Sequence, residues 1–513
     1  MCRLLFTDIR AITKDKFLLA LEKMIDGGPD APLCYYEVGG CKLGHNRLSI
    51  LDLNPRSNQP FFSADGRYAI IYNGEIYNYK ELAREYGIEL RTNCDTELIL
   101  SLSLKIGFKQ ALATFNGMFA YVIFDTTSKE IFVARDRLGI KPLYILENSE
   151  GRIISSEMSA VVELLGGNVQ IDETALRQYK KLRTFFNGRT IYKGIQMFPA
   201  GCCMEMGRIE SYWELPVGHQ IAPSDEELKD LIESSVRYRK IADVPLGSYL
   251  SGGLDSTIVA ALTKELHTWT VGFEDNNEFE WGRLASKRIG SSHHEIVVDR
   301  QMFLADAKFM IAKRKEPLSV PNEVLLYEMT KAVKKHNTVI LSGEGADELF
   351  FGYDRIFRWA ASKDEFDLKE FSDLYSYGSN DDLEIVESAV APFYKYGKPI
   401  DVVAAFFQVA HLHGLLRRVD NSTMACSVEA RVPFCDHRLV ERMAGVPFEY
   451  RMQGGIVKAP LKRIFADLIP EEIVKRKKVG FPVSLQDIFH VKKASAFDAW
   501  FAFNLENLGI KGA

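Results

Sequence analysis

One short loop has the composition of an anion-binding site, and it reads Ser251-Gly252-Gly253-Leu254-Asp255-Ser256 between an apolar strand pattern and an apolar helix pattern. Backbone N–H groups of a glycine-rich turn and of a helix N-terminus bind anions, and the two glycines let the anion approach closely. Ser251 and Ser256 add hydroxyl donors. The loop has no lysine, so it differs from a Walker A loop. Because Asp255 would repel a bare phosphate, we expect a Mg²⁺–polyphosphate here.

A second acidic segment follows another predicted strand and reads "LSGEGADE" over residues 341–348. Because the carboxyl ends of parallel strands meet at one edge of a sheet, Glu344 and Asp347 are expected near the loop above. Asp255 and Asp347 then lie where they can share Mg²⁺. Acids at the start of a helix are also common for purely structural reasons.

A nucleophile stands at the other end of the chain, where Cys2 follows the initiator methionine. If Met1 is removed, the thiol (pKa ~8.5) lies beside its own α-amine (pKa ~7.7–8.0), which can accept the thiol proton. An amino-acid substrate needs an arginine for its carboxylate, carboxylates for its ammonium and amide donors for its oxyanion. Segments "HNRLSILDL", "YNGEIYN" and "NCDTE" supply these types as Arg47, Asn73, Gly74, Glu75 and Asp95.

These motifs together resemble known families. The 251–256 loop resembles the pyrophosphate loop of N-type ATP pyrophosphatases. With 341–348 and "SVEARVPFCD" (427–436), the carboxyl half resembles the synthetase domain of glutamine-hydrolysing asparagine synthetases. The set around Cys2 resembles the glutaminase motif of class II amidotransferases, and the resemblance runs from residue 2 to about residue 485.

The resemblance implies a role for each matched residue in the first half. Cys2 is the nucleophile, and Arg47 binds the carboxylate of glutamine. The Asn73 side chain and the Gly74 N–H form the oxyanion hole. Glu75 and Asp95 hold the amino end of glutamine.

In the second half, the resemblance implies that Asp255 and Asp347 are Mg²⁺ ligands and that Glu344 faces the reacting carboxyl as a base. Lys458, in "GGIVKAPLKR", neutralises charge on the adenylate and pyrophosphate, with Lys462 as the competing candidate. The expected ATP-binding residues are Ser251, Gly252, Gly253, Asp255, Ser256, Val271, Ser342 and Gly343. Adenylation by ATP would supply the leaving group that a carboxylate lacks, and glutamine-derived ammonia would then form the amide.

The carboxylate acceptor stays open. The sequence departs from the family pattern at Lys315-Glu316-Pro317, Phe351-Gly352-Tyr353 and Asn421, which we expect near the acceptor. Aspartate is the first choice, which makes the enzyme asparagine synthase-like; a sugar uronate or another biosynthetic acid is the alternative. A β-lactam-synthetase-like cyclase is disfavoured because it needs no glutaminase set, and a scaffold pseudoenzyme because both reactive sets are present.

The surrounding patterns indicate which elements hold these residues. Short strands and helices before residue 200, such as the hairpin at 118–136, predict an α/β sandwich of antiparallel sheets, which the resemblance makes the Ntn glutaminase type. Strand, loop and helix alternate from about residue 240, which predicts a doubly wound parallel sheet with a mostly helical extension. The expected domains are a glutaminase domain (2–205), a linker (206–224) and an ATP-dependent synthetase domain (225–513).

Bulk properties narrow the class of protein. The 513 residues are 47% hydrophobic with a net charge of −5, so we expect neither a nucleic-acid nor a membrane partner. No stretch approaches ~18 apolar residues, and the basic cluster at 475–478 is expected to be a solvated helix end. Eight cysteines without C-x-x-C spacing favour the cytoplasm. The amphipathic tail at 496–508 is expected to pack on its own core; packing on a second subunit, as a homodimer, is the alternative.

Overall fold

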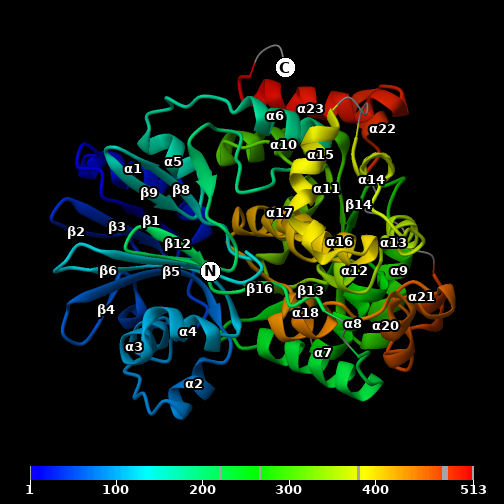
Figure 1. Cartoon of the computed structure of the whole chain (residues 1–513), viewed down its shortest axis with the longest axis horizontal. Coiled ribbons are helices and arrows are strands. Elements are labelled where there is room, and N and C mark those ends of the chain that lie inside the picture. The colour runs from blue at the N-terminus through cyan, green and yellow to red at the C-terminus, as the bar shows by residue number, and fades with distance from the viewer. Residues whose placement is uncertain (1, 219–220, 265–266, 378–381, 477–482, 511–513) are drawn as a thin grey trace.

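The computed structural model describes residues 2–218, 221–264, 267–377, 382–476 and 483–510. Two six-stranded antiparallel sheets build the N-terminal half, coloured blue through cyan to blue-green in Figure 1. The first has the order β10 (Ile195–Met197), β8 (Tyr144–Asn148), β9 (Gly151–Ser155), β1 (Arg3–Thr7), β3 (Cys41–Asn46), β2 (Cys34–Val38). The second has the order β12 (Arg208–Ser211), β11 (Cys202–Glu205), β7 (Ile131–Arg135), β6 (Gly117–Asp125), β5 (Tyr68–Ile76), β4 (Phe61–Phe62).

The two sheets pack face to face and are covered by helices on their outer sides. Leu4 and Phe6 of β1 share a buried cluster with Ala69 and Ile71 of β5, whereas the intervening Leu5 packs outward. This is the alternation that a strand imposes on its side chains. The helices of this half are α1 (Lys14–Glu22), α2 (Tyr79–Glu85), α3 (Asp95–Ile106), α4 (Phe108–Thr114), α5 (Met158–Leu164) and α6 (Glu173–Leu182). The predicted sandwich of antiparallel sheets is confirmed.

The C-terminal half contains a five-stranded parallel sheet. Its order is β15 (Ser292–Val297), β14 (His267–Gly272), β13 (Leu246–Tyr249), β16 (Val339–Leu341), β17 (Glu429–Arg431). Val339 and Leu341 of β16 pack on one face, and Ile340 packs on the other. Both faces are therefore covered, as the predicted doubly wound sheet requires. The strand order reverses between β13 and β16, which is where such sheets bind ligands.

Helices surround this sheet and form the extension beyond residue 354. Those next to the sheet are α7 (Asp225–Arg239), α8 (Leu254–Thr263), α9 (Phe279–Ile289), α10 (Arg300–Arg314), α11 (Asn322–Val333) and α12 (Ala346–Leu349). The extension contains α13 (Asp354–Ala361), α14 (Leu368–Tyr375), α15 (Leu383–Val390), α16 (Pro399–Phe406), α17 (Leu412–Met424), α18 (His437–Met443), α19 (Phe448–Arg451), α20 (Ala459–Ile464), α21 (Glu471–Lys475), α22 (Leu485–Phe489) and α23 (Ala496–Asn507).

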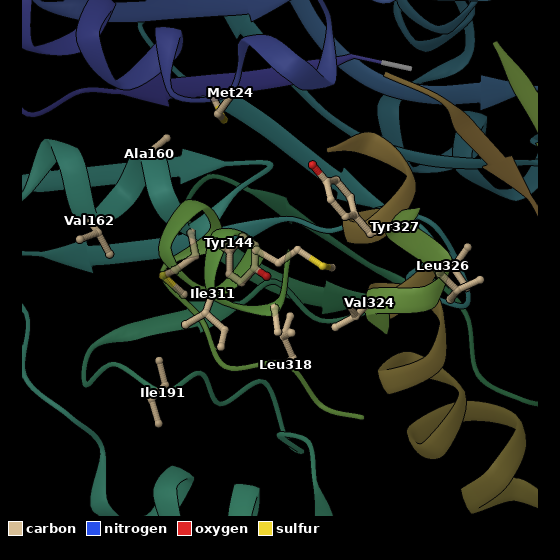
Figure 2. Close-up of a cluster of buried hydrophobic side chains, with 14 of the residues drawn as sticks. Met24, Tyr144, Ala160, Val162, Ile191, Ile311, Leu318, Val324, Leu326 and Tyr327 are labelled. Atoms are coloured by element: carbon tan, nitrogen blue, oxygen red, sulfur yellow. The ribbon is translucent and has the colours of Figure 1, made fainter. Parts of the chain in front are cut away.

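The two halves share a core. One buried cluster contains side chains of both, and Figure 2 draws part of it, with Met24, Tyr144, Ala160, Val162 and Ile191 from the first half and Ile311, Leu318, Val324, Leu326 and Tyr327 from the second. Trp500 and Phe501 of α23 belong to the same cluster, so the tail packs on its own core as expected. The domain boundaries remain a prediction; β12 lies within the segment expected to be a linker.

One expectation from hydropathy needs a correction. Pro399–Met424, which joins α16 to α17, is long and apolar enough to cross a membrane by length and composition, with a mean hydropathy of 1.3 in its best window. More than half of that window is buried, and α17 packs against α11. A core helix passes the same test, so this segment is weak evidence for a membrane span.

Candidate functional site

Cys2 and Asn73 meet because each lies on the inner side of its sheet. Cys2 precedes β1 and continues the side of Leu4 and Phe6, and Asn73 continues the side of Ile71 on β5. The Cys2 backbone nitrogen lies 3.3 Å from Asn73 Oδ1, and its Sγ lies 3.9 Å from the Leu48 carbonyl oxygen. Burial raises the pKa of the Cys2 thiol. A base is therefore needed to form the thiolate near neutral pH.

The strand after Asn73 has room only for glycine. A Cβ at Gly74 would lie 2.7 Å from the Phe119 Cα of neighbouring β6 and 2.9 Å from the Tyr72 ring. Asn73 is fully buried, and its Nδ2 lies 3.5 Å from Ser156 Oγ. The close strand contact thus fixes the backbone at Gly74, and Asn73 lies beside Cys2; their role as the oxyanion hole stays a prediction.

Arg47 is buried but keeps its charge available. Nη1 donates to the Asn54 carbonyl at 2.9 Å and to Asn58 Oδ1 at 2.8 Å. Nη2 donates to the carbonyls of Leu51 (3.2 Å) and Asp52 (2.5 Å). All four acceptors are neutral oxygens, so they orient the guanidinium without cancelling its charge, which can then attract a carboxylate.

Asp95 begins α3 and is fixed by two hydrogen bonds. Its Oδ2 accepts from the Tyr72 hydroxyl and from the Ile76 N–H, both at 2.7 Å. Burial raises the pKa of Asp95, and these two donors oppose that shift. Burial and then the charge of Asp95 raise the pKa of the Glu75 carboxyl well above its usual range. Two buried carboxylates therefore lie close together, an arrangement that attracts a cation.

Glu75 has a cationic partner from the other half of the molecule. Arg431, at the end of β17, donates from Nη2 to Glu75 Oε2 at 3.1 Å and from Nε to Glu429 Oε1 at 2.5 Å. The charge of Arg431 opposes the rise in the Glu75 pKa. In the sequence Arg431 stands within the 427–436 motif, and no spacing pattern there indicates that it reaches Glu75.

The second site is a cavity of about 820 Å³ at the carboxyl ends of β13, β14 and β16. Its lining includes Ser251, Gly253, Asp255 and Ser256. Ser251 Oγ lies 3.0 Å from Ser256 Oγ, and the Gly253 N–H donates to Ser251 Oγ at 3.3 Å. Within the loop, these groups form hydrogen bonds with one another. A bound phosphate can accept hydrogen bonds from the same donors, so none of them is left without an acceptor.

Asp255 and Asp347 converge on a single cation. Lys458 Nζ lies 2.5 Å from Asp255 Oδ2 and 2.6 Å from Asp347 Oδ1. Burial alone would lower the pKa of Lys458, but the two carboxylates raise it above its usual range. Lys462 also lines the cavity, and burial followed by Lys458 lowers its pKa. No cluster of three or more acidic, histidine or cysteine ligands occurs among the described residues. Two carboxylates facing one point suit Mg²⁺, which takes its remaining ligands from phosphate and water.

The other predicted ATP residues lie around this cavity. Val271, Ser342 and Gly343 line it. A Cβ at Gly343 would lie 2.9 Å from the Ser256 nitrogen, so this glycine lets the loops after β13 and β16 touch. Gly252 adopts φ +72°, and its carbonyl oxygen accepts from Arg476 at 3.4 Å. Gly252 therefore shapes the turn of the loop.

The basic cluster at 475–478 differs from expectation. Lys475 and Arg476 line the cavity, and Arg476 pairs with Glu278 and lies 4.3 Å from the Trp281 ring centre. The prediction of a solvated helix end is wrong for Arg476, because a carboxylate and a ring from the 278–281 segment cover it. Residues 477 and 478 lie outside the described residues.

Glu344 has a partner that sequence reasoning missed. Its Oε1 accepts from Arg418 Nη2 at 2.7 Å, and both residues line the cavity. Of the departures from the family pattern, Gly352 and Tyr353 also line it. Asn421, and Glu316 of the 315–317 segment, instead line a separate cavity of about 20 Å³ beside Arg3 and Tyr144, and neither residue lines the 820 Å³ cavity.

Helix α17 connects the two sites. Asp420, two residues after Arg418, pairs with Arg3 at 3.0 Å and with Lys141 at 3.1 Å. Arg3 is the residue after Cys2. Both pairs are buried, so they fix α17 against the N-terminal sheets.

Comparisons with known proteins agree with this division. A model of the family described as "Glutamine amidotransferase domain" matches residues 1–213, and the "Asparagine synthase" model matches residues 227–501. A putative glutamine-hydrolysing asparagine synthetase of Mycobacterium tuberculosis is 31% identical over 90% of this chain and 82% of its own length. Asparagine synthetase 1 of Bacillus subtilis is 29% identical over 91% and 83%, and that of Gallus gallus 30% over 94% and 83%.

Among solved structures, a glutamine phosphoribosylpyrophosphate amidotransferase from B. subtilis aligns at 16% identity with a TM-score of 0.31. The alignment covers 51% of this chain and 63% of that one. A TM-score of 0.31 is too low to support an argument, so the assignment of the fold is based on the sheets given above.

Proposed function

The chain belongs to the family of glutamine-hydrolysing asparagine synthetases, and we propose that its two sites divide the reaction between ammonia release at Cys2 and carboxylate activation at the 251–256 loop. The protein is thus a glutamine-dependent ligase. The observation that carries the proposal is the convergence of Asp255, Asp347 and Lys458 in the lining of the 820 Å³ cavity.

In the glutaminase half, the Cys2 thiolate attacks the side-chain amide of glutamine. Arg47 binds the substrate carboxylate, and Glu75 with Asp95 binds its ammonium. The Asn73 amide and the Gly74 N–H stabilise the oxyanion. The Cys2 α-amine, which took the thiol proton, gives it to the leaving nitrogen as the oxyanion collapses to a thioester, and ammonia is released. Water then cleaves the thioester to give glutamate and free Cys2.

In the synthetase half, an oxygen of the acceptor carboxylate attacks the α-phosphorus of ATP, and pyrophosphate leaves. The loop amides with Ser251 and Ser256 hold the pyrophosphate, and Lys458 offsets its charge. Asp255 and Asp347 would hold Mg²⁺, which lowers the charge on the phosphates when bound. Ammonia then displaces AMP from the acyl group, and Glu344 accepts the proton that the nitrogen loses.

Aspartate is the proposed acceptor. Of the segments that depart from the family pattern, 315–317 and Asn421 do not line the 820 Å³ cavity, whereas Gly352 and Tyr353 of the 351–353 segment do. The 315–317 segment and Asn421 therefore carry no argument for a different acid. A complete glutaminase set also speaks against a cyclase, which needs no ammonia. A cytoplasmic location is part of the proposal; homodimer formation is left open.

The proposal is tested by separating the two half-reactions. Cys2→Ala removes the nucleophile, so we expect asparagine formation from aspartate, ATP and Mg²⁺ to stop with glutamine and to persist with ammonium. The control Cys202→Ala, which removes a half-buried thiol on β11, should support both. If ammonium supports asparagine formation by the wild type but not by Cys2→Ala, the idea of two separable sites is refuted. A uronate accepted in place of aspartate would overturn the proposed acceptor alone.

A further inference from the structure

Arg418 is a buried cation in the wall of the synthetase cavity. Its residue is 7% exposed, and it lines the cavity from α17. Nη2 donates to Glu344 at 2.7 Å and Nη1 donates to Asn322 Oδ1 at 3.2 Å. Its Nε is buried and has no hydrogen-bond acceptor among the described residues. A buried donor without an acceptor costs ~1–3 kcal/mol, more when charged, so a bound ligand is the natural acceptor.

The neighbouring Arg417 has a structural role, and its contacts differ from those of Arg418. It is buried to a similar extent, but its guanidinium lies 3.5 Å from Glu316 and 3.2 Å from Thr184 Oγ1, over the Phe185 ring. It faces the other half of the molecule and does not line the 820 Å³ cavity. The two adjacent arginines of α17 therefore face different parts of the molecule: Arg418 faces the cavity, and Arg417 faces the N-terminal half.

The rest of the cavity leaves Arg418 on the acceptor's side. Asp255, Asp347 and Lys458 occupy the phosphate end, where the reacting carboxyl must meet the α-phosphorus. Glu344 lines the same cavity and pairs with Arg418 of α17. Glu344 accepts from Nη2 and Asn322 accepts from Nη1, so Nε is the guanidinium donor that is left for an anion.

We propose that Arg418 binds the carboxylate of the acceptor that does not react, and so makes the enzyme selective for acids with a second anionic group. This inference rests on the proposed function, because it assigns the acceptor to this cavity. An acid with a single carboxylate would have that group adenylated, so no second carboxylate would remain to accept a hydrogen bond from Arg418 Nε. Sites built to bind a polar group discriminate strongly against ligands that lack it.

The test compares aspartate with β-alanine, which keeps the amine and the reacting carboxyl and lacks only the second carboxylate. Binding of each is measured by calorimetry with Mg²⁺ and a non-hydrolysable ATP analogue. Pyrophosphate release is measured with ATP and ammonium, which bypasses Cys2. The proteins are wild type, Arg418→Met, Arg418→Lys and the matched control Arg417→Met. Glutaminase activity of each reports whether the chain is folded.

Wild type should prefer aspartate over β-alanine by ~100-fold or more. Arg418→Met should weaken aspartate ~10- to 150-fold and change β-alanine little, which collapses the ratio. Arg418→Lys should recover part of the preference for aspartate over β-alanine, and Arg417→Met should keep the full preference. Equal losses for both acids in Arg418→Met, or no preference in wild type, would overturn the inference. Arg418-dependent aspartate binding without pyrophosphate release would support it while contradicting the proposed function.

Discussion

Arg431 joins the two halves at the glutamine site, and its removal should impair glutamine hydrolysis. The guanidinium is fully buried and donates to Glu75, to Glu429 and to the carbonyls of Arg239 (2.9 Å) and Ile241 (2.6 Å). In Arg431→Met two buried carboxylates lose their cation. Breaking one partner of a buried pair costs ~3–5 kcal/mol of unfolding free energy.

The functional loss follows from the charge of Glu75. Burial and Asp95 already raise the pKa of Glu75, and only Arg431 among its larger influences opposes the rise from a side chain. Without Arg431 the pKa of the Glu75 carboxyl rises further, so a smaller fraction of it is ionised and its attraction for an ammonium weakens. A charge-assisted hydrogen bond contributes ~1.5–3 kcal/mol, so glutaminase kcat/KM should fall about 10- to 150-fold. Raising the pH ionises Glu75 again and should recover part of the loss.

The assay follows glutamate release against glutamine concentration between pH 6.5 and 8.5. Ammonium-supported pyrophosphate release serves as a check on the synthetase half, and Arg431→Lys as the charge-retaining control. Glu75→Gln should cause a similar loss, and the double variant should lose little more, because one interaction is removed twice. An unchanged kcat/KM in Arg431→Met, or fully additive losses in the double variant, would refute the reasoning.

Three further predictions concern other buried charges. Lys458→Ala should lower pyrophosphate release ~10²–10³-fold, and Lys462→Ala much less; the reverse order would exchange their roles. Asp420→Asn removes the buried carboxylate that pairs with Lys141 and with Arg3, which keeps Glu157, and should cost ~3–5 kcal/mol in urea unfolding; a cost below ~1 kcal/mol, typical of exposed pairs, would contradict it. Burial lowers the pKa of His45 to about 3, so the unfolded state binds more protons below pH 6.5. Stability should then fall by up to ~1.4 kcal/mol per unit between pH 6.5 and 3; equal pH slopes for wild type and His45→Gln would contradict this.

The parallel sheet was predictable where apolar runs precede helices, as in β13, β14 and β16. The strand β17 was not, because its three residues are Glu429, Ala430 and Arg431, and charged residues disfavour buried strands. Ion pairs with Glu75 and within the strand satisfy these charges. Those partners are distant in sequence, so tertiary contacts override local propensity here.

The candidate sites show the same limit. Asp255 and Asp347 could be brought together from sequence, because each follows a strand of one parallel sheet. Lys458 was predicted through the family resemblance alone; its position between the two carboxylates depends on a loop that adopts φ +55° at this residue. No pattern in the sequence predicts a role for Arg418, because it stands beside Arg417 in one helix and only the packing of α17 distinguishes the two.

The most direct measurement identifies what becomes of ATP. Phosphorus NMR of a reaction with Mg²⁺, ATP, aspartate and glutamine should show AMP and pyrophosphate appearing in equal amounts, matched by asparagine and glutamate. Formation of ADP and orthophosphate in step with asparagine would contradict activation by adenylate transfer at the 251–256 loop.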